Sequence, residues 1–144
     1  MRAFLLLLCL LTGLALAQSY TFDGLYLGQD VTTIPWLPRQ YKENIDRKAT
    51  GPTGLAYPGK PFIEMTAGKL TKIVGQQVRV GSTFLRVGDA ESRVSRVMGS
   101  PLSHIDHTDG KGRALFYDGI YFNITEGKVS DIAASTEYLR KRSR

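Results

Sequence analysis

Apolar and polar residues alternate in two stretches of the chain, and a glycine-containing polar turn interrupts each stretch. Residues 121–124 and 129–132 flank the turn at Gly127, and residues 62–73 repeat the arrangement around Gly68. Glycine supplies the positive φ that a tight hairpin turn requires, and the flanking runs suit half-buried strands. A further β-rich run precedes each hairpin, so we expect three antiparallel strands at the end of each stretch.

A short helix is predicted before the second group of strands. Within residues 90–98 the apolar positions recur at helical spacing, and the charged residues fall off that face. Asp89 is the expected N-cap, and Gly99 and Pro101 are the expected stop signals. This segment is the clearest helix in the sequence.

The first stretch lacks an equivalent helix. Residues 31–34 have room for one turn, but Pro35 and Pro38 prevent its continuation. The polar residues 39–54 are predicted to form an extended loop, and residues 76–82 a joint between the two stretches.

Three segments of the first stretch recur in the second, in the same order and about sixty residues later. The matched pairs are 25–28 with 85–88, 55–59 with 115–119, and 62–73 with 121–132. We therefore predict an α+β fold of two tandem modules, each a short helix packed on a three- to four-stranded antiparallel sheet, with a degenerate helix in the first. The expected boundaries are 18–77, 78–136 and a basic tail at 137–144.

The first 17 residues have the order of a secretory signal peptide: an early Arg, an uncharged apolar run, and small residues at the end. Cleavage is predicted between Ala17 and Gln18, and no transmembrane segment is expected after it. The single cysteine, Cys9, leaves with the signal, which excludes a disulfide framework. The whole chain has 42% hydrophobic residues and a net charge of +6, and the part left after cleavage is expected to be a folded, exported protein, periplasmic or secreted.

The second stretch resembles a known exported module. Gly88 starts the predicted helix, Gly99-Ser100-Pro101 ends it, residues 115–117 form an aromatic strand, and Gly127-Lys128-Val129 forms the last hairpin. This pattern resembles the SmpA/OmlA (BamE)-like and β-lactamase inhibitor protein (BLIP)-like superfamily. The resemblance implies a bacterial protein that works by protein–protein contact and has no catalytic residue. The chain departs from the pattern in lacking a lipidation cysteine and in its proline-broken first helix.

Aromatic residues are the candidate binding residues. Trp36 and Tyr41 lie in the proline-stiffened segment, and rings held in such a segment lose little entropy on docking. Tyr57, Tyr117 and Tyr121 lie on or beside predicted strands, where alternate side chains face inward. The alternative for Trp36 is that it fills the core in place of the missing helix.

One cluster has the residue types of a metal site. His104, Asp106, His107 and Asp109 lie within six residues, and zinc and copper prefer such ligands. The spacing matches no ordered metal-binding motif, so a solvated connection between helix and strand is the favoured interpretation. We expect no metal and no other cofactor.

The C-terminal residues Arg140, Lys141, Arg142 and Arg144 form a short basic run. Such a run can contact an anionic surface, although a frayed terminus is the simpler interpretation. The other basic residues are scattered, which gives no support for specific nucleic-acid binding.

Taken together, these features predict a non-catalytic exported interaction module that binds a cell-envelope or secreted protein. The first alternative is a proteinaceous inhibitor of a secreted hydrolase, which would use residues 34–41. The second is a metal-dependent enzyme centred on His104 and His107.

Overall fold

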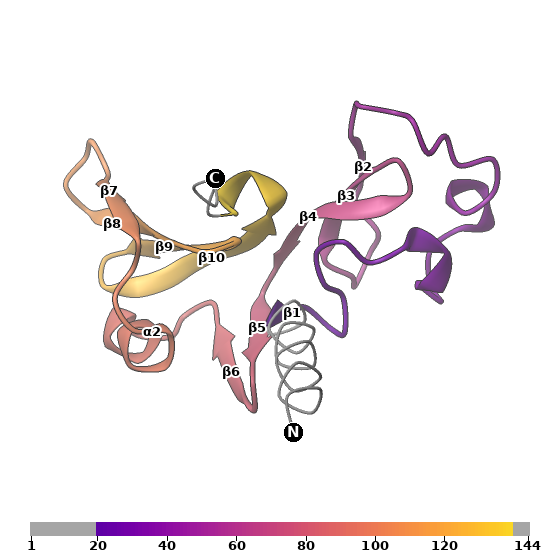
Figure 1. Cartoon of the computed structure of the whole chain (residues 1–144). Helices are drawn as coiled ribbons and strands as arrows, with labels where there is room; N and C mark the ends of the chain where they lie inside the picture. The colour runs from indigo at the N-terminus through magenta and orange to yellow at the C-terminus, as the bar shows by residue number, and fades with distance from the viewer. Residues whose placement is uncertain (1–19, 140–144) are drawn as a thin grey trace, which may run out of the picture.

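The structure is a computed structural model and describes residues 20–139. Figure 1 shows the elements along the chain. In chain order they are β1 (Tyr20–Thr21), η1 (Val31–Thr33), η2 (Arg39–Tyr41), β2 (Thr53–Leu55), β3 (Phe62–Thr66), β4 (Lys69–Gly75), β5 (Gln77–Val80), β6 (Thr83–Arg86), α2 (Glu91–Met98), β7 (Ser103–Asp106), β8 (Gly112–Tyr117), β9 (Ile120–Thr125), β10 (Lys128–Ser135) and η3 (Thr136–Tyr138), where η denotes a 3₁₀ turn.

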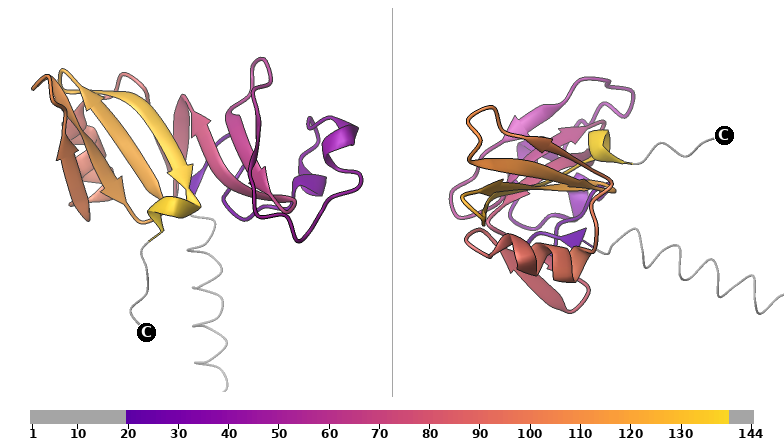
Figure 2. Two further views of the ribbon diagram at one scale, coloured as in Figure 1. Left: turned by 90° about the horizontal axis from the view of Figure 1, so that it is seen from above. Right: turned by 90° about the vertical axis from the view of Figure 1, so that its left-hand side faces the viewer.

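The strands form two antiparallel sheets. The larger sheet has seven strands in the order β2-β3-β4-β10-β9-β8-β7, and the smaller has three in the order β1-β5-β6. Strands β4 and β10 pair in the middle of the large sheet and join its two halves, with Val74 opposite Ala133. The resulting sheet runs through most of the length of the molecule, and the turns and loop of the first half extend beyond it (Figure 2).

The predicted fold class is wrong. The protein is mostly β, with 44% of the described residues in strands and 14% in helical turns, and it does not consist of two tandem helix-on-sheet modules. The strands predicted for two modules lie in one sheet, because the edges of β4 and β10 pair with each other and satisfy each other's backbone groups. The one α-helix among residues 20–139 is α2.

The segment expected as a joint, residues 76–82, is a strand and a turn. Its β5 pairs with β6 from Gln77 opposite Arg86 to Val80 opposite Thr83. Gly81 has a φ of +61° in the turn between them, a conformation that glycine adopts without steric cost. The alternation of polar and apolar residues around Val78 was the signal for this hairpin.

The core lies between one face of the seven-stranded sheet and the elements that cover it. This inner face is covered by α2 and the β5–β6 hairpin in the second half of the chain, both on the same side of the sheet (Figures 1 and 2). In the first half, η1 and the segment after it supply Val31, Ile34 and Leu37 to the same core. Alternate strand residues such as Ile63, Phe122 and Ile132 are fully buried there, as the period of two along a strand requires.

The helix α2 is confirmed, with its start displaced by one residue. Ala90 is the N-cap, while the Asp89 carboxylate accepts a hydrogen bond from the Arg86 N–H instead. Val94 is fully buried and Gly99 ends the helix with a φ of +77°. None of the helices within residues 20–139 is long and apolar enough to cross a membrane.

The prediction for residues 31–38 is also confirmed. η1 is a single turn that ends before Pro35, because proline has no N–H for the next helical bond. The loop after it, predicted as extended, contains the short turn η2 and ends in the strand β2. Arg47 holds this loop to the rest of the protein by donating to the Asp30 carboxylate at 3.0 Å.

Candidate functional site

The face of the seven-stranded sheet opposite α2, here called the open face, carries a row of apolar side chains, of which Ala133 is fully buried and the other four are half-buried. Strand alternation turns these residues away from the core. The register places them opposite one another on five adjacent strands, in the order Phe62, Val74, Ala133, Tyr121 and Phe116. Phe62 passes over Gly54 of β2, where a Cβ would lie 3.2 Å from the Phe62 ring. The row therefore runs from one half of the sheet to the other.

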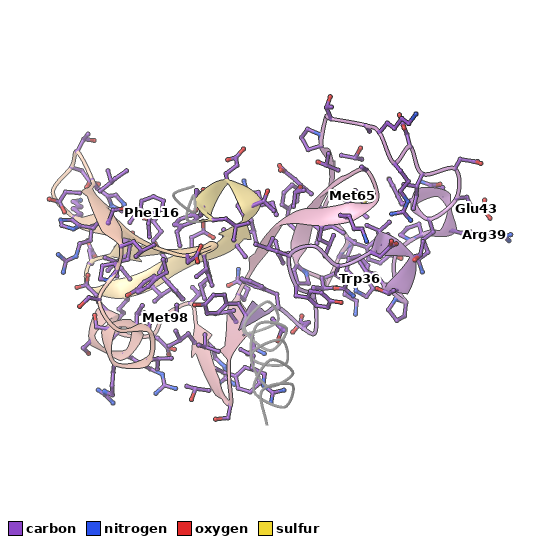
Figure 3. All side chains as sticks on the ribbon, viewed as in Figure 1. Trp36, Arg39, Glu43, Met65, Met98 and Phe116 are labelled. Atoms are coloured by element: carbon purple, nitrogen blue, oxygen red, sulfur yellow. The ribbon has the colours of Figure 1, made fainter. Side chains whose placement is uncertain are left out.

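Three aromatic rings gather at one end of this row. Phe116 stacks on Tyr121 with ring centroids 5.7 Å apart, and the Tyr138 ring lies edge-on to Phe116 at 5.5 Å and to Tyr121 at 5.2 Å. All three side chains are half-buried. We call Phe116, Tyr121 and Tyr138 the aromatic cluster; Figure 3 shows Phe116 on the side of the sheet opposite Met98 of α2.

The turn after β10 positions Tyr138. The Gly119 N–H donates to the Tyr138 carbonyl at 3.0 Å, and the Ser135 N–H donates to the Gly119 carbonyl at 3.0 Å. Ser135 also caps η3 by accepting from the Glu137 N–H. Sequence reasoning assigned Tyr138 to a basic tail and missed its role, although a serine before Thr-Glu-Tyr is a capping signal.

The hydroxyl of Tyr121 is fixed by a carboxylate. It donates to Asp131 Oδ2 at 2.8 Å, and burial together with this hydrogen bond raises the pKa of Tyr121 above its ordinary value. The hydroxyl is therefore a neutral donor, and one polar group lies beside the aromatic rings. His107 Nε2 and Asn123 Oδ1, 2.7 Å apart, add a second polar pair on the same face.

The other end of the apolar row opens into a groove of about 730 Å³. Phe62 and Val74 form one side of it, and Gln77 and Arg86 of the β5–β6 hairpin line it as well. Asp23 and Lys60 add charges. The lining of the groove is therefore a mixture of apolar, polar and charged residues.

Tyr117, a sequence candidate for binding, lies on the inner face. Only 5% of its surface is exposed, and its hydroxyl donates to the Gly99 carbonyl at 2.9 Å. Its ring stands edge-on to Phe122 at 5.9 Å. Tyr117 therefore joins the end of α2 to the core, while Tyr121, four residues later, reaches the open face.

Trp36, Tyr41 and Tyr57 lie in the first half of the molecule. Trp36 is half-buried against the core, 5.8 Å from the Tyr57 ring and 5.9 Å from Lys60 Nζ. Tyr41 is also half-buried against the core, and Tyr57 is 44% exposed. Ile34 and Leu37 on either side of Trp36 are buried, while Pro35, Arg39 and Gln40 of the same segment are exposed.

The predicted cluster of metal-ligand types is divided between two faces of a strand. Residues 103–106 form β7 and not a loop. His104 Nε2 and Asp106 Oδ1 are 3.9 Å apart on one side, while His107 reaches Asn123 on the other. Asp109 caps the turn at Gly110 by accepting from the Lys111 N–H. Within residues 20–139, no group of three or more His, Cys, Asp or Glu side chains is placed to hold a metal ion.

Two predicted features lie outside the described residues: the signal peptide at 1–17, and the basic run of Arg140, Lys141, Arg142 and Arg144. The predicted boundaries after residues 77 and 136 stay predictions.

Comparison of the chain with protein-family models, curated proteins and solved structures finds no match. The resemblance to the BamE-like and BLIP-like superfamily therefore stays a prediction from the sequence.

Proposed function

We propose that this protein is a non-catalytic exported binding module that holds a protein of the cell envelope, or a secreted protein, on the open face of its sheet. The observation that supports this proposal is the aromatic cluster on that face. Half-buried Tyr and Phe rings lose little conformational entropy on binding and bury a large apolar area, which makes them typical anchors of protein interfaces.

The surroundings of the cluster fit the same role. A central apolar area with a polar rim is the usual composition of a protein interface. The rings form the centre here, and the His107–Asn123 pair and Asp131 form the rim. The sheet holds the rings in place before a partner arrives, which lowers the cost of association.

The hydrolase-inhibitor alternative would place the contact at residues 34–41, of which Ile34 and Leu37 are buried and Pro35, Arg39 and Gln40 are exposed. A metal-dependent enzyme would need His104 and His107 on one side of their strand, and their contacts lie on opposite faces. Neither alternative gains support from the described part of the chain.

A photo-crosslinking experiment tests the proposal. A photoreactive phenylalanine analogue replaces Tyr138 in cells that produce the protein naturally. The control carries the same analogue at Phe84, an aromatic residue of β6 that is 41% exposed and lies outside the open face. We expect a discrete adduct with an exported protein from position 138 and none from position 84. Equal adducts from both positions, or an adduct from position 84 alone, would contradict the proposal.

A further inference from the structure

The strand β7 is an edge of the seven-stranded sheet. It pairs only with β8, and nothing within residues 20–139 pairs with its outer side. All four of its residues are exposed, and Ile105 has 62% of its surface accessible. An open edge of this kind is a template for pairing with another strand. Figure 1 shows β7 at the opposite end of the molecule from β2.

The hydrogen bonds to β8 show which backbone groups of β7 face outward. The His107 N–H donates to the Gly112 carbonyl at 2.9 Å. Hydrogen-bonding residues alternate along an antiparallel strand, so the backbone groups of Ser103 and Ile105 also face β8. The N–H and C=O groups of His104 and Asp106 consequently point away from the sheet.

The sequence of β7 is complementary to itself in the register that these groups select. When two copies of β7 pair antiparallel about Ile105, His104 of each copy lies opposite Asp106 of the other. The backbone groups of His104 and Asp106 point outward and can form the hydrogen bonds between the two copies. The backbone hydrogen bonds and the side-chain pairs therefore favour the same register. Two imidazole–carboxylate pairs then form on one face, and Ile105 meets Ile105 of the second copy on the other. In the single chain His104 Nε2 is already 3.9 Å from Asp106 Oδ1, both side chains being mostly exposed.

We propose that a second copy of this chain occupies the β7 edge, so that two sheets join through a two-fold axis at Ile105. Two-fold dimers are the commonest soluble oligomers, because one surface complements itself. The chain already contains an edge pairing of this type, since β4 and β10 join antiparallel with Val74 opposite Ala133. The dimer extends the same sheet by the same kind of contact.

The dimer has a consequence for the open face. A two-fold axis through an antiparallel strand pair is perpendicular to the sheet, so both open faces point to the same side. If the proposed function holds, two aromatic clusters act together on one partner or on two adjacent ones. The pairing of β7 itself does not depend on that function.

Disulfide trapping tests the register. Ile105→Cys and His104→Cys are compared in full chains that also carry Cys9→Ser, with oxidised glutathione as the oxidant that accepts the two electrons. Facing residues of a non-hydrogen-bonded pair are close enough for a disulfide. His104 and His104 of the second copy are about 8 Å apart in this register, beyond disulfide reach. We expect at least a tenfold larger cross-linked fraction for Ile105→Cys; equal fractions, or none in either variant, would overturn the proposal.

A proline substitution tests the dimer without a cross-link. His104→Pro removes an N–H that faces outward, so the single chain keeps its hydrogen bonds to β8, as edge strands tolerate. Sedimentation equilibrium is expected to show a concentration-dependent dimer for the native chain and at least a tenfold higher Kd for His104→Pro, with an unchanged unfolding temperature of the monomer. A native chain that sediments only as a monomer would overturn the proposal. So would a monomer whose His104 and Asp106 amides resist hydrogen exchange, because another part of its own chain then occupies the edge.

Discussion

The two halves of the seven-stranded sheet share a set of backbone hydrogen bonds and differ in the segments that cover them. In the first half the Gly28 N–H donates to the Leu70 carbonyl at 2.8 Å; in the second, the Gly88 N–H donates to the Val129 carbonyl at 2.7 Å. The bonds from Val31 to Gly68 and from Glu91 to Gly127, both 2.9 Å, correspond in the same way. The pattern of backbone hydrogen bonds between the sheet and its covering segments is therefore repeated in the two halves.

Two irregularities of the sheet are repeated as well. The hairpin turns at Ala67-Gly68 and Glu126-Gly127 have nearly the same φ values, +51° and +77° in the first and +50° and +77° in the second. A register shift follows each turn, where Thr71 donates to the Glu64 carbonyl and Ser130 donates to the Asn123 carbonyl. Such bulges bend and twist a strand, so both halves of the sheet curve alike.

The segments that cover the two halves of the sheet differ in particular at the N-cap residue of their first helical turn. Asp30 caps η1 and also contacts Arg47 and Lys69, which holds the long loop in the first half. Ala90 occupies the corresponding N-cap of α2 and has no side-chain cap. The open faces differ too, because the three-ring aromatic cluster lies only in the second half. The two halves therefore share a backbone arrangement but carry different surfaces. The proposed function assigns binding to the open face of the second half.

The largest predicted effect separates the two hairpin turns. A Cβ at Gly68 would lie 2.6 Å from Ile45 Cγ2, whereas a Cβ at Gly127 would meet nothing within 4 Å. Both positions have the same positive φ. We expect Gly68→Ala to lower the free energy of unfolding by about 3 kcal/mol, from backbone strain and a steric clash. Gly127→Ala, with strain alone, is expected to cost about 1 kcal/mol. Urea unfolding measures both losses in the free energy of unfolding. Equal losses would contradict the close packing of the first-half loop against the turn at Gly68.

The next effect concerns the cap that only the first half has. Hydrogen bonds from Thr32, and then from Arg47, lower the pKa of Asp30 well below its ordinary value. Asp30→Ala is expected to lower the free energy of unfolding by about 1.5 kcal/mol at neutral pH.

The same substitution gives a pH dependence with a defined sign. Because the pKa of Asp30 is lower in the folded protein, its stabilisation is complete above the ordinary value of 3.8 and is lost as the pH falls below it. Urea unfolding at several pH values is therefore expected to show that the native chain and Asp30→Ala converge in acid. A gap that stays constant in acid would contradict this account of Asp30.

A smaller effect distinguishes Tyr57 from Tyr117, which correspond in the repeated sequence. Tyr117→Phe removes the buried hydroxyl that donates to Gly99 and is expected to lower the free energy of unfolding by about 1 kcal/mol. Tyr57→Phe acts on a ring that is 44% exposed and serves as the control, with no measurable change. Thermal or urea unfolding compares the two, and equal losses would contradict the different placement of these rings.

The smallest predicted effect comes from a substitution that makes the second half more like the first. Tyr121 occupies the place that Phe62 has in the first half, so Tyr121→Phe exchanges one residue type for the other. Losing the hydrogen bond to Asp131 is expected to cost about 0.5 kcal/mol. In an ultraviolet titration of the Tyr121→Phe variant, the tyrosine with the most strongly raised pKa is expected to be missing. A titration curve that keeps that group would assign the raised pKa to another tyrosine.

Features of the fold that depend on residues close together in the chain were predicted from the sequence. The turns at Gly68 and Gly127, the end of α2 at Gly99 and the proline block after η1 depend on residues near one another in the chain, and the structure has all of them. The pairing of β4 with β10 depends on two edges about sixty residues apart, and no local pattern encodes it. This long-range pairing is why the fold class was wrong.

The candidate site was predicted only in part, for a related reason. Tyr121 was chosen and lies on the open face, but Phe116 and Tyr138 were not chosen as binding residues. Their rings meet Tyr121 only because the turn after β10 returns to Gly119. For Tyr117 the sequence could not decide which face its ring would take, because the answer depends on which side α2 covers.

Affinity for the protein captured by crosslinking at position 138 tests the central claim most directly. Binding is compared by calorimetry for the native chain, Tyr138→Ser in the aromatic cluster and Tyr57→Ser in the first half. We predict that Tyr138→Ser raises Kd at least tenfold, a loss of about 1.4 kcal/mol or more, while Tyr57→Ser leaves Kd unchanged. A Kd that changes for Tyr57→Ser and not for Tyr138→Ser would contradict the assignment of binding to the open face of the second half.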